Sequence, residues 1–272
     1  MNNIKVPKLS IAILIAIILI SFIGPFFYNV SPYEFNKNAI LEPPTLSHLF
    51  GTDRLGRDLL ARVIKGGQVS LIIGVGSAII ASIIGLVYGV IAGYFKGFWD
   101  KSFVVIVDLF LTFPTFFLLL TLISYIDASS LILIIVIAIT GWMGTARLIR
   151  SQAYQISSKP FIKILKVGKV STFKIIFKYF LPLLGPIFFV SFSFGVSGAI
   201  LAESGLSYLG LGITPPNMSW GSILSSGKSV MEIAWWVSFF PGLFIFLVTF
   251  SLIQISDYLQ ELFNLKENSI KN

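Results

Sequence analysis

Long apolar segments separated by short polar ones run through the whole chain. Six of these segments reach the roughly 18 to 20 residues that an α-helix needs to cross the hydrocarbon core of a bilayer. The pattern predicts an all-α, polytopic membrane protein with about six transmembrane helices, in one domain that covers residues 1–272. The predicted spans cover residues 9–28, 69–94, 103–125, 130–149, 180–202 and 235–258.

The first apolar segment, residues 9–28, follows Lys5 and Lys8 in the manner of a signal peptide. We interpret it as a retained span, because it is longer than a usual signal core. The segment also ends in the bulky residues Phe26–Tyr28, where a cleavage site would have small residues. Such aromatic residues are typical of the membrane interface.

Composition supports the bilayer as solvent and narrows the chemistry. Hydrophobic residues make up 56% of the chain and charged residues 12%, against roughly 25% charged in a soluble domain. Cysteine is absent, which excludes disulfides, thiol nucleophiles and cysteine-ligated metals. The single histidine, His48, has no neighbouring ligand set for a metal or a catalytic base. We therefore expect no catalytic residue, no metal site and no cofactor.

The net charge of +8 could suggest a nucleic-acid partner, but in a membrane protein basic residues first report orientation. With both termini in the cytoplasm, fourteen of the twenty basic residues fall on the inner side. This distribution predicts a multi-pass protein of the cell membrane with cytoplasmic termini and no nucleic-acid partner. The fourteen are Lys5, Lys8, Lys96, Lys101, Arg147, Arg150, Lys159, Lys163, Lys166, Lys169, Lys174, Lys178, Lys266 and Lys271.

The cytoplasmic loop at residues 150–179 is the most unusual stretch. Eight basic residues and no acidic one lie between Arg147 and Lys178. Lys159 and Pro160 favour a helix start, and the spacing of the apolar positions that follow predicts a stripe along that helix. Such a helix could lie on anionic lipid or dock into a groove of a cytosolic protein. The predicted docking residues are Pro160, Phe161, Ile164, Leu165 and Gly168.

The second span carries small residues spaced four apart, at Ser77, Ala81, Gly85, Gly89 and Gly93. This spacing places them on one face and predicts a close helix contact. The contact is either packing within the chain or, alternatively, a dimer seam or mobile gate.

Asp108 and Glu203 are the charges nearest to bilayer depth. Charges at that depth usually face protein or water. Each carboxylate therefore either lines a transport route or fixes a helix contact.

The segment GSILSSGKS, residues 221–229, nearly fits the phosphate-binding loop of nucleotide hydrolases. Five residues rather than four separate its two glycines, and no strand-loop-helix pattern surrounds it. We therefore predict no nucleotide site and no enzymatic activity in this chain.

Three segments together carry a resemblance to a known family. FGTDRLGRD at residues 50–58, KIIFKYFLPLLGPI at 174–187 and SYLGLGITPPNMSWG at 207–221 resemble the permease subunit of binding-protein-dependent ABC importers of the dipeptide, oligopeptide and nickel class. FPGL at residues 240–243 fits as well. The resemblance covers nearly the whole chain and implies a type I ABC importer-like permease.

The resemblance implies a heteromeric importer that carries peptide or a nickel chelate. Its partners would be a second homologous permease, two cytosolic ATPases and an extracytoplasmic binding protein. In the family, the cytoplasmic loop holds a docking helix with a Glu-Ala-Ala pattern followed by glycine. Those positions fall on Lys163, Ile164, Leu165 and Lys169, so this chain departs from the pattern, with Gly168 one position early.

Two other classes compete with this interpretation. A stand-alone secondary transporter or channel would show paired intramembrane charges or inverted repeats with interrupted helices. A lipid-processing enzyme would need a nucleophile and base, or a histidine and carboxylate cluster. The sequence displays neither convincingly. Peptide is preferred over a nickel chelate because no cluster of metal ligands is evident.

Overall fold

The computed structural model describes residues 6–126 and 128–271, and their side chains as far as Phe263. Regular structure in these residues is helical, with one isolated β-bridge between Thr52 and Asp58. Lys5, Lys266 and Lys271 of the predicted cytoplasmic set lie outside the fully described part. The helices are α1 (Lys8–Phe22), α2 (Gly24–Phe27), α3 (Leu59–Phe95), α4 (Gly97–Leu111), α5 (Thr115–Ile123), α6 (Ser130–Ser158), α7 (Pro160–Val167), α8 (Thr172–Ile175), the π-helix η1 (Ile176–Phe180), α9 (Leu181–Tyr208), α10 (Trp220–Gly227), the 3-10 helix η2 (Lys228–Val230) and α11 (Trp236–Lys271).

Short polar side chains start several of these helices. The Asp58 carboxylate accepts a hydrogen bond from the Ala61 amide at 2.8 Å at the start of α3. The Ser129 hydroxyl does the same for α6, and Ser219 begins α10 in a capping box with Ser222. These bonds satisfy amides that have no partner within the helix.

Four described helices are long and apolar enough to cross a membrane, and a fifth span results if α4 and α5 count as one bent helix. The break between α4 and α5 bends the chain by 75°. It precedes Pro114, which lacks an amide hydrogen and disfavours helical backbone in the residue before it.

The structure differs from the sequence prediction over residues 9–28. The apolar segment there forms the 15-residue helix α1 and the short helix α2 instead of one continuous span. Pro25 lies at the start of α2 and interrupts the helix. Helix α1 alone is therefore shorter than the other candidate spans.

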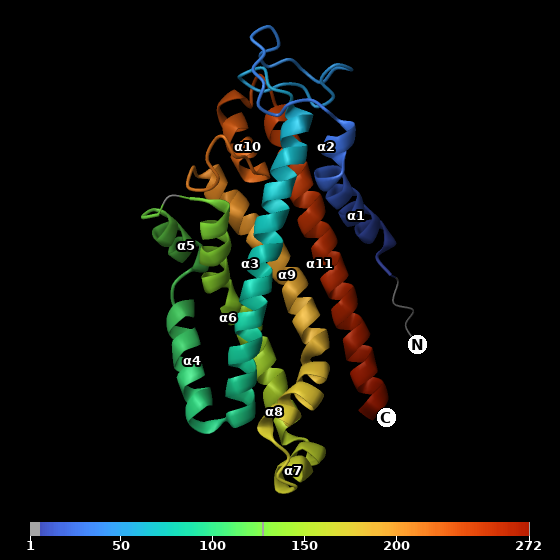
Figure 1. Ribbon diagram of the computed structural model, residues 1–272, viewed down its shortest axis with the longest axis vertical. Coiled ribbons are helices and arrows are strands. Elements are labelled where there is room, and N and C mark those ends of the chain that lie inside the picture. The colour runs from blue at the N-terminus through green and yellow to red at the C-terminus, as the bar shows by residue number, and fades with distance from the viewer. Residues whose placement is uncertain (1–5, 127, 272) are drawn as a thin grey trace.

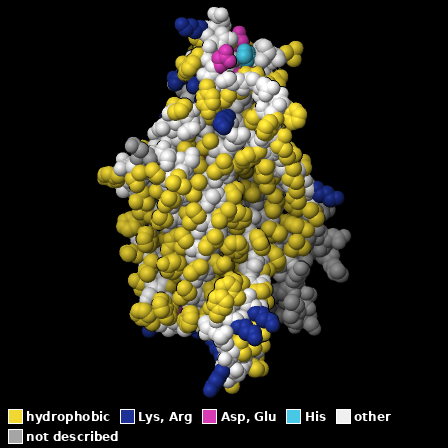
Figure 2. Space-filling model, in the orientation of Figure 1, with side chains coloured by type: hydrophobic (Ala, Val, Ile, Leu, Met, Phe, Trp, Pro, Cys, Tyr) yellow, Lys and Arg dark blue, Asp and Glu magenta, His cyan; other side chains and the backbone are white. Residues whose placement is uncertain are grey.

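Helix α3 runs through the middle of the bundle, beside α6 and α9 (Figure 1). Helices α4 and α5 lie on one side of α3, and α11 and α1 lie on the other side. Helix α7 forms one end of the molecule, here named the α7 end. Helix α10 and the connection at residues 28–58 form the other, the α10 end. On the face drawn in Figure 2, hydrophobic side chains cover the zone between the ends, and charged side chains lie mainly at the two ends, with basic ones at both. This distribution matches a protein that crosses a bilayer along its long axis.

Candidate functional site

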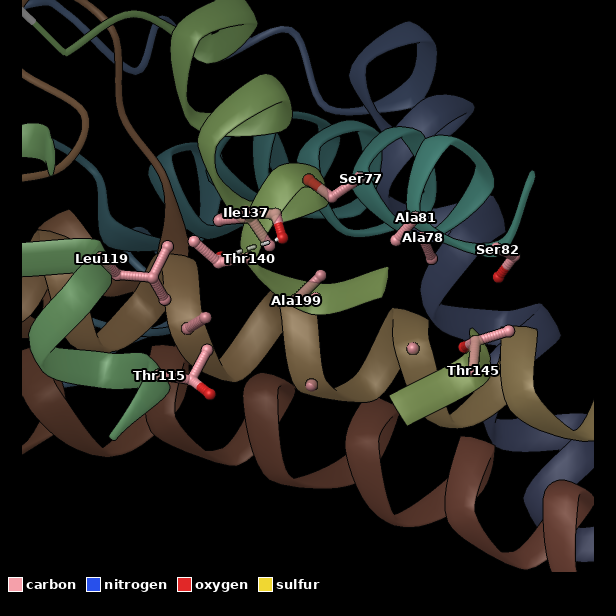
Figure 3. Close-up of a pocket in the computed structure, with 14 residues that line it drawn as sticks. Ser77, Ala78, Ala81, Ser82, Thr115, Leu119, Ile137, Thr140, Thr145 and Ala199 are labelled. Carbon is pink, nitrogen blue, oxygen red and sulfur yellow. Dashed lines mark hydrogen bonds between the residues drawn. The ribbon is translucent and has the colours of Figure 1, made fainter. Parts of the chain in front are cut away.

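A cavity of about 220 Å³ lies among α3, α5, α6 and α9 (Figure 3). Hydroxyl-bearing residues from three of these helices line it, together with alanines and glycines, and no charged residue is among the lining residues. The small side chains keep the cavity open, and the hydroxyls make part of its wall polar. The hydroxyl residues are Ser77 and Ser82 of α3, Thr115 of α5, and Thr140 and Thr145 of α6.

The row of small residues on α3 divides into two parts. Ser77 and Ala81 line the cavity. Gly85, Gly89 and Gly93 instead pack against α6, and a Cβ atom at Gly89 would come within 2.8 Å of the Ala146 carbonyl oxygen. The glycines therefore permit a close helix contact within the chain.

Two ion pairs join α4 to α6. Arg150 donates to both oxygens of Asp100, at 2.5 and 2.9 Å. Arg147 donates to Asp108, and both side chains of this pair are about half exposed. Asp108 therefore pairs with α6 and does not line the cavity. The sequence analysis assigned Arg147 and Arg150 only to orientation, because two residues so distant from Asp100 and Asp108 give no local signal of pairing.

Glu203 lies in α9 with no exposed surface. Its carboxylate accepts hydrogen bonds from the Ser70 hydroxyl of α3 at 3.1 Å and the Ser207 hydroxyl at 2.6 Å. Ser70 also accepts from the Trp220 amide at the start of α10. Glu203 thus connects α3, α9 and α10, and it too lies outside the cavity lining.

Helix α7 places the predicted docking residues in two environments. Ile164 is 70% exposed, and Phe161 is exposed with its ring 6.2 Å from that of Tyr179. Leu165 is instead partly buried against the chain's own core, and Ile162, which the sequence analysis did not select, is fully buried. The free apolar face of α7 therefore consists of Phe161, Ile164 and Val167, and Leu165 lies at its edge, partly against the core, so its docking role stays a prediction.

The two ends of α7 follow from local backbone chemistry. Pro160 occupies the first turn, where its missing amide hydrogen costs nothing, and the preceding Lys159 is extended. At the other end, Gly168 has a φ of −71° and Lys169 has a φ of +52°. The residue in the left-handed region is thus Lys169, and Gly168 does not use its special freedom.

Lys166 anchors α7 to the bundle. Its ammonium group lies 4.1 Å from the centre of the Tyr94 ring, near the end of α3. The Tyr94 ring in turn meets Phe180 edge-on, at 5.2 Å, just before α9. Burial and the nearby Lys96 lower the pKa of Lys166. Helix α7 therefore contacts α3 directly and is linked to Phe180, the residue before α9, only through Tyr94.

The connection at residues 28–58 is held by charged groups. Arg57 donates to Asp53 at 2.7 Å, and the buried Arg62 lies 3.4 Å from the same carboxylate. His48 Nδ1 lies 2.9 Å from Asp58. The described residues contain no group of three side chains that could hold a metal ion.

Comparison with known proteins assigns the chain to a family. Residues 85–266 match the family described as binding-protein-dependent transport system inner membrane component. The chain is 34% identical over 265 residues to the oligopeptide transport system permease protein OppC of Haemophilus influenzae, covering 97% of this chain and 85% of that protein. It is 35% identical over 267 residues to the dipeptide transport system permease protein DppC of Bacillus subtilis, covering 96% and 82%. The chain therefore belongs to the family of binding-protein-dependent inner membrane transport components, as one of its multi-pass permease subunits.

Proposed function

We propose that this chain is the permease subunit of an ATP-driven importer of peptides. It would form half of the channel beside a second, homologous permease, with two ATPase subunits at the α7 end and a binding protein at the α10 end. The similar proteins from Haemophilus influenzae and Bacillus subtilis are named as oligopeptide and dipeptide permeases, which favours peptide over a nickel chelate. Family membership also favours a subunit of a larger assembly over a stand-alone transporter or channel.

The observation that carries this proposal is the free apolar face of α7. Ile164 and Val167 are 70% and 84% exposed at the tip of the molecule, beside the exposed lysines of the same helix. Covering apolar surface stabilises a contact by roughly 25 cal/mol per Å². A short helix with such a face fits a groove in a partner protein, and we assign that groove to the ATPase.

The contacts of Lys166 suggest how work done by the ATPase would enter the channel. A movement of α7 would act on Tyr94 of α3 and, through Tyr94, on Phe180 at the start of α9. Both α3 and α9 line the cavity. The bundle would then alternate between two arrangements that ATP biases from a distance.

The same assignment gives the orientation. ATP is cytosolic, so the α7 end would face the cytoplasm, together with both termini. The α10 end would receive cargo from the binding protein. Residues 221–229, which nearly fit a phosphate-binding loop, lie entirely within the helices α10 and η2. ATP hydrolysis is accordingly assigned to the partner subunits.

Purification from a native membrane in mild detergent tests the proposal. The chain should copurify with a second membrane chain and with ATPase subunits. Ile164→Asp should lower ATPase recovery more than tenfold without loss of the permease, since the side chain is already exposed. Lys174→Glu, in the neighbouring helix α8 and also exposed, adds negative charge outside α7 and should leave recovery unchanged. Uptake by the purified chain alone would overturn the proposal.

A further inference from the structure

Two exposed phenylalanines lie where the chain enters the helix that leads into α9. Phe173 is 70% exposed and Phe177 is 55% exposed, and the centres of their rings lie 4.1 Å apart. Lys174 and Lys178 follow them in the sequence and are exposed as well. We name these four residues the α8 patch. Two exposed rings are unfavourable in water, so the α8 patch is suited to a partner that covers apolar and basic groups together.

The depth of the α8 patch follows from the charges along its helix. Residues 172–208 form one candidate span. Lys178 is the last charge before residues 179–202, which contain none and exceed the roughly 20 residues that cross the hydrocarbon core. The hydrocarbon core therefore begins next to Lys178. Phe173 lies only about 8 Å farther out by the helix rise, so the α8 patch lies at the level of the lipid headgroups.

The end of α3 marks the same level independently. Residues 66–95 contain no charge, and Lys96 follows them. The Tyr94 ring lies 5.2 Å from the ring of Phe180, at the end of η1, so the two helix ends are level. Just beyond Lys96, Trp99 is 56% exposed. Exposed aromatic and basic residues at one depth on two helices are typical of a membrane interface.

These features select an anionic lipid surface as the partner. Aromatic rings pack well at headgroup depth, and lysine ammonium groups there are attracted to anionic lipid. No acidic residue lies between Arg147 and Lys178, so no carboxylate of this loop competes with lipid phosphate. The orientation proposed above places the α8 patch at the cytoplasmic leaflet, which contains anionic lipid. Helix α7 differs, because it forms the tip of the molecule, where a cytosolic protein reaches it (Figure 1).

We propose that the α8 patch binds the headgroups of anionic phospholipids. Lipid bound there holds the start of α9 at the membrane surface while α7 moves with the ATPase. The α8 patch is separate from the free apolar face of α7, which we assign to the ATPase. This inference goes beyond the proposed transport function and requires only that the bundle crosses a bilayer.

Native mass spectrometry of the full-length chain in detergent tests the binding. With phosphatidylglycerol present, the double variant Lys174→Glu with Lys178→Glu should retain at least fivefold less lipid than the wild type. Both side chains are exposed, so the fold should be kept. The matched control, Lys159→Glu with Lys163→Glu, makes the same charge change at exposed positions before and within α7 and should stay within twofold of the wild type. Equal losses in both double variants would show attraction to the basic loop as a whole and overturn the α8 patch.

A fluorescent label tests the depth separately, because the chain contains no cysteine. For the full-length chain in nanodiscs, a bimane label on Phe173→Cys should be quenched by lipids that carry a nitroxide on the headgroup. A label on Ile164→Cys, an exposed position on α7, should be quenched at least threefold less. Equal quenching at the two positions overturns the proposed depth. Adding the ATPase subunits should leave the quenching at Phe173→Cys unchanged. If they remove it, a protein covers the α8 patch, and the proposal is overturned.

The outcomes separate this inference from the proposed function. Ile164→Asp should lower ATPase recovery and leave lipid retention unchanged, whereas Lys174→Glu with Lys178→Glu should lower lipid retention and leave ATPase recovery unchanged. If the wild type retains no more phosphatidylglycerol than phosphatidylcholine, the α8 patch is overturned and the transport function stands. If the chain copurifies with no ATPase but the lipid results hold, the lipid surface stands without the proposed function.

Discussion

The amide of Val170 donates to the carbonyl of Leu165 at 3.1 Å, across the end of α7. The amide of Lys169 donates to Lys166, also at 3.1 Å. These two bonds form a Schellman motif, which requires a left-handed residue at Lys169 and is usually built with glycine. Leu165 and Val170 both pack against the core cluster that includes Ile162, so the motif fixes how α7 sits on the bundle.

Replacing Lys169 with glycine should stabilise this turn. The left-handed backbone costs a residue with a side chain about 1 to 2 kcal/mol, and the change removes that cost, partly offset by the greater freedom of glycine when unfolded. Amide hydrogen exchange at residues 165–170 of the purified transporter should slow severalfold. Lys169→Ala keeps the Cβ and removes the charge, so equal slowing there would attribute the effect to charge instead.

The Glu203 carboxylate should be needed mainly for packing of α3, α9 and α10. Glu203→Leu leaves Ser70 and Ser207 without their acceptor, which costs about 1 to 3 kcal/mol for each buried group. The apparent melting temperature should fall by several degrees. Glu203→Gln retains one acceptor oxygen and should lower the melting temperature less. The control Glu42→Gln, at a partly exposed residue, should leave the melting temperature unchanged. Normal melting with abolished uptake in Glu203→Gln would instead support a gating role.

Substitution of Gly89 should separate packing within the chain from a seam between subunits. A Cβ there overlaps Ala146 and Ile149 of α6, and overpacking typically costs about 1 to 3 kcal/mol. Gly89→Ala should therefore lower the melting temperature of the isolated chain. Gly144→Ala, with free space at its Cβ on α6, should raise it slightly through better helix propensity. If Gly89 instead lies in a seam between subunits, Gly89→Ala should keep the melting temperature of the isolated chain and lose the second permease on purification.

These cases show which parts of the structure the sequence can predict. The spacing of Gly85, Gly89 and Gly93 indicates a close contact, because periodicity places them on one face, and the structure packs that face on α6. Pro114 also marks the bend between α4 and α5, although the apolar pattern by itself predicts one span over residues 103–125. Both are local features, in which the residue type itself limits the backbone.

The remaining features depend on neighbours distant in sequence. The apolar spacing of α7 predicts a stripe, but in a helix this short it cannot assign Ile162 to the core, Leu165 to the edge of the core and Ile164 to the exposed surface. The sequence does not predict the cavity either, because the cavity forms only where α3, α5, α6 and α9 meet around Ser77. Pairing between α4 and α6 carries no local signal either.

The Asp108–Arg147 pair offers the sharpest test of that long-range pairing. Asp108 is two turns farther along α4 than Asp100, about 12 Å by the helix rise, and exposed apolar side chains surround it in sequence. Arg147→Gln should leave an unpaired carboxylate at membrane depth, which costs about 3 kcal/mol. We expect a lower melting temperature in bilayer nanodiscs.

The double variant Asp108→Asn with Arg147→Gln should recover most of the loss, because no charge then stays unpaired. Arg150→Gln, at the α7 end where water can reach Asp100, should cost less. If the double variant melts as low as Arg147→Gln, the arginine contributes through packing rather than through its charge.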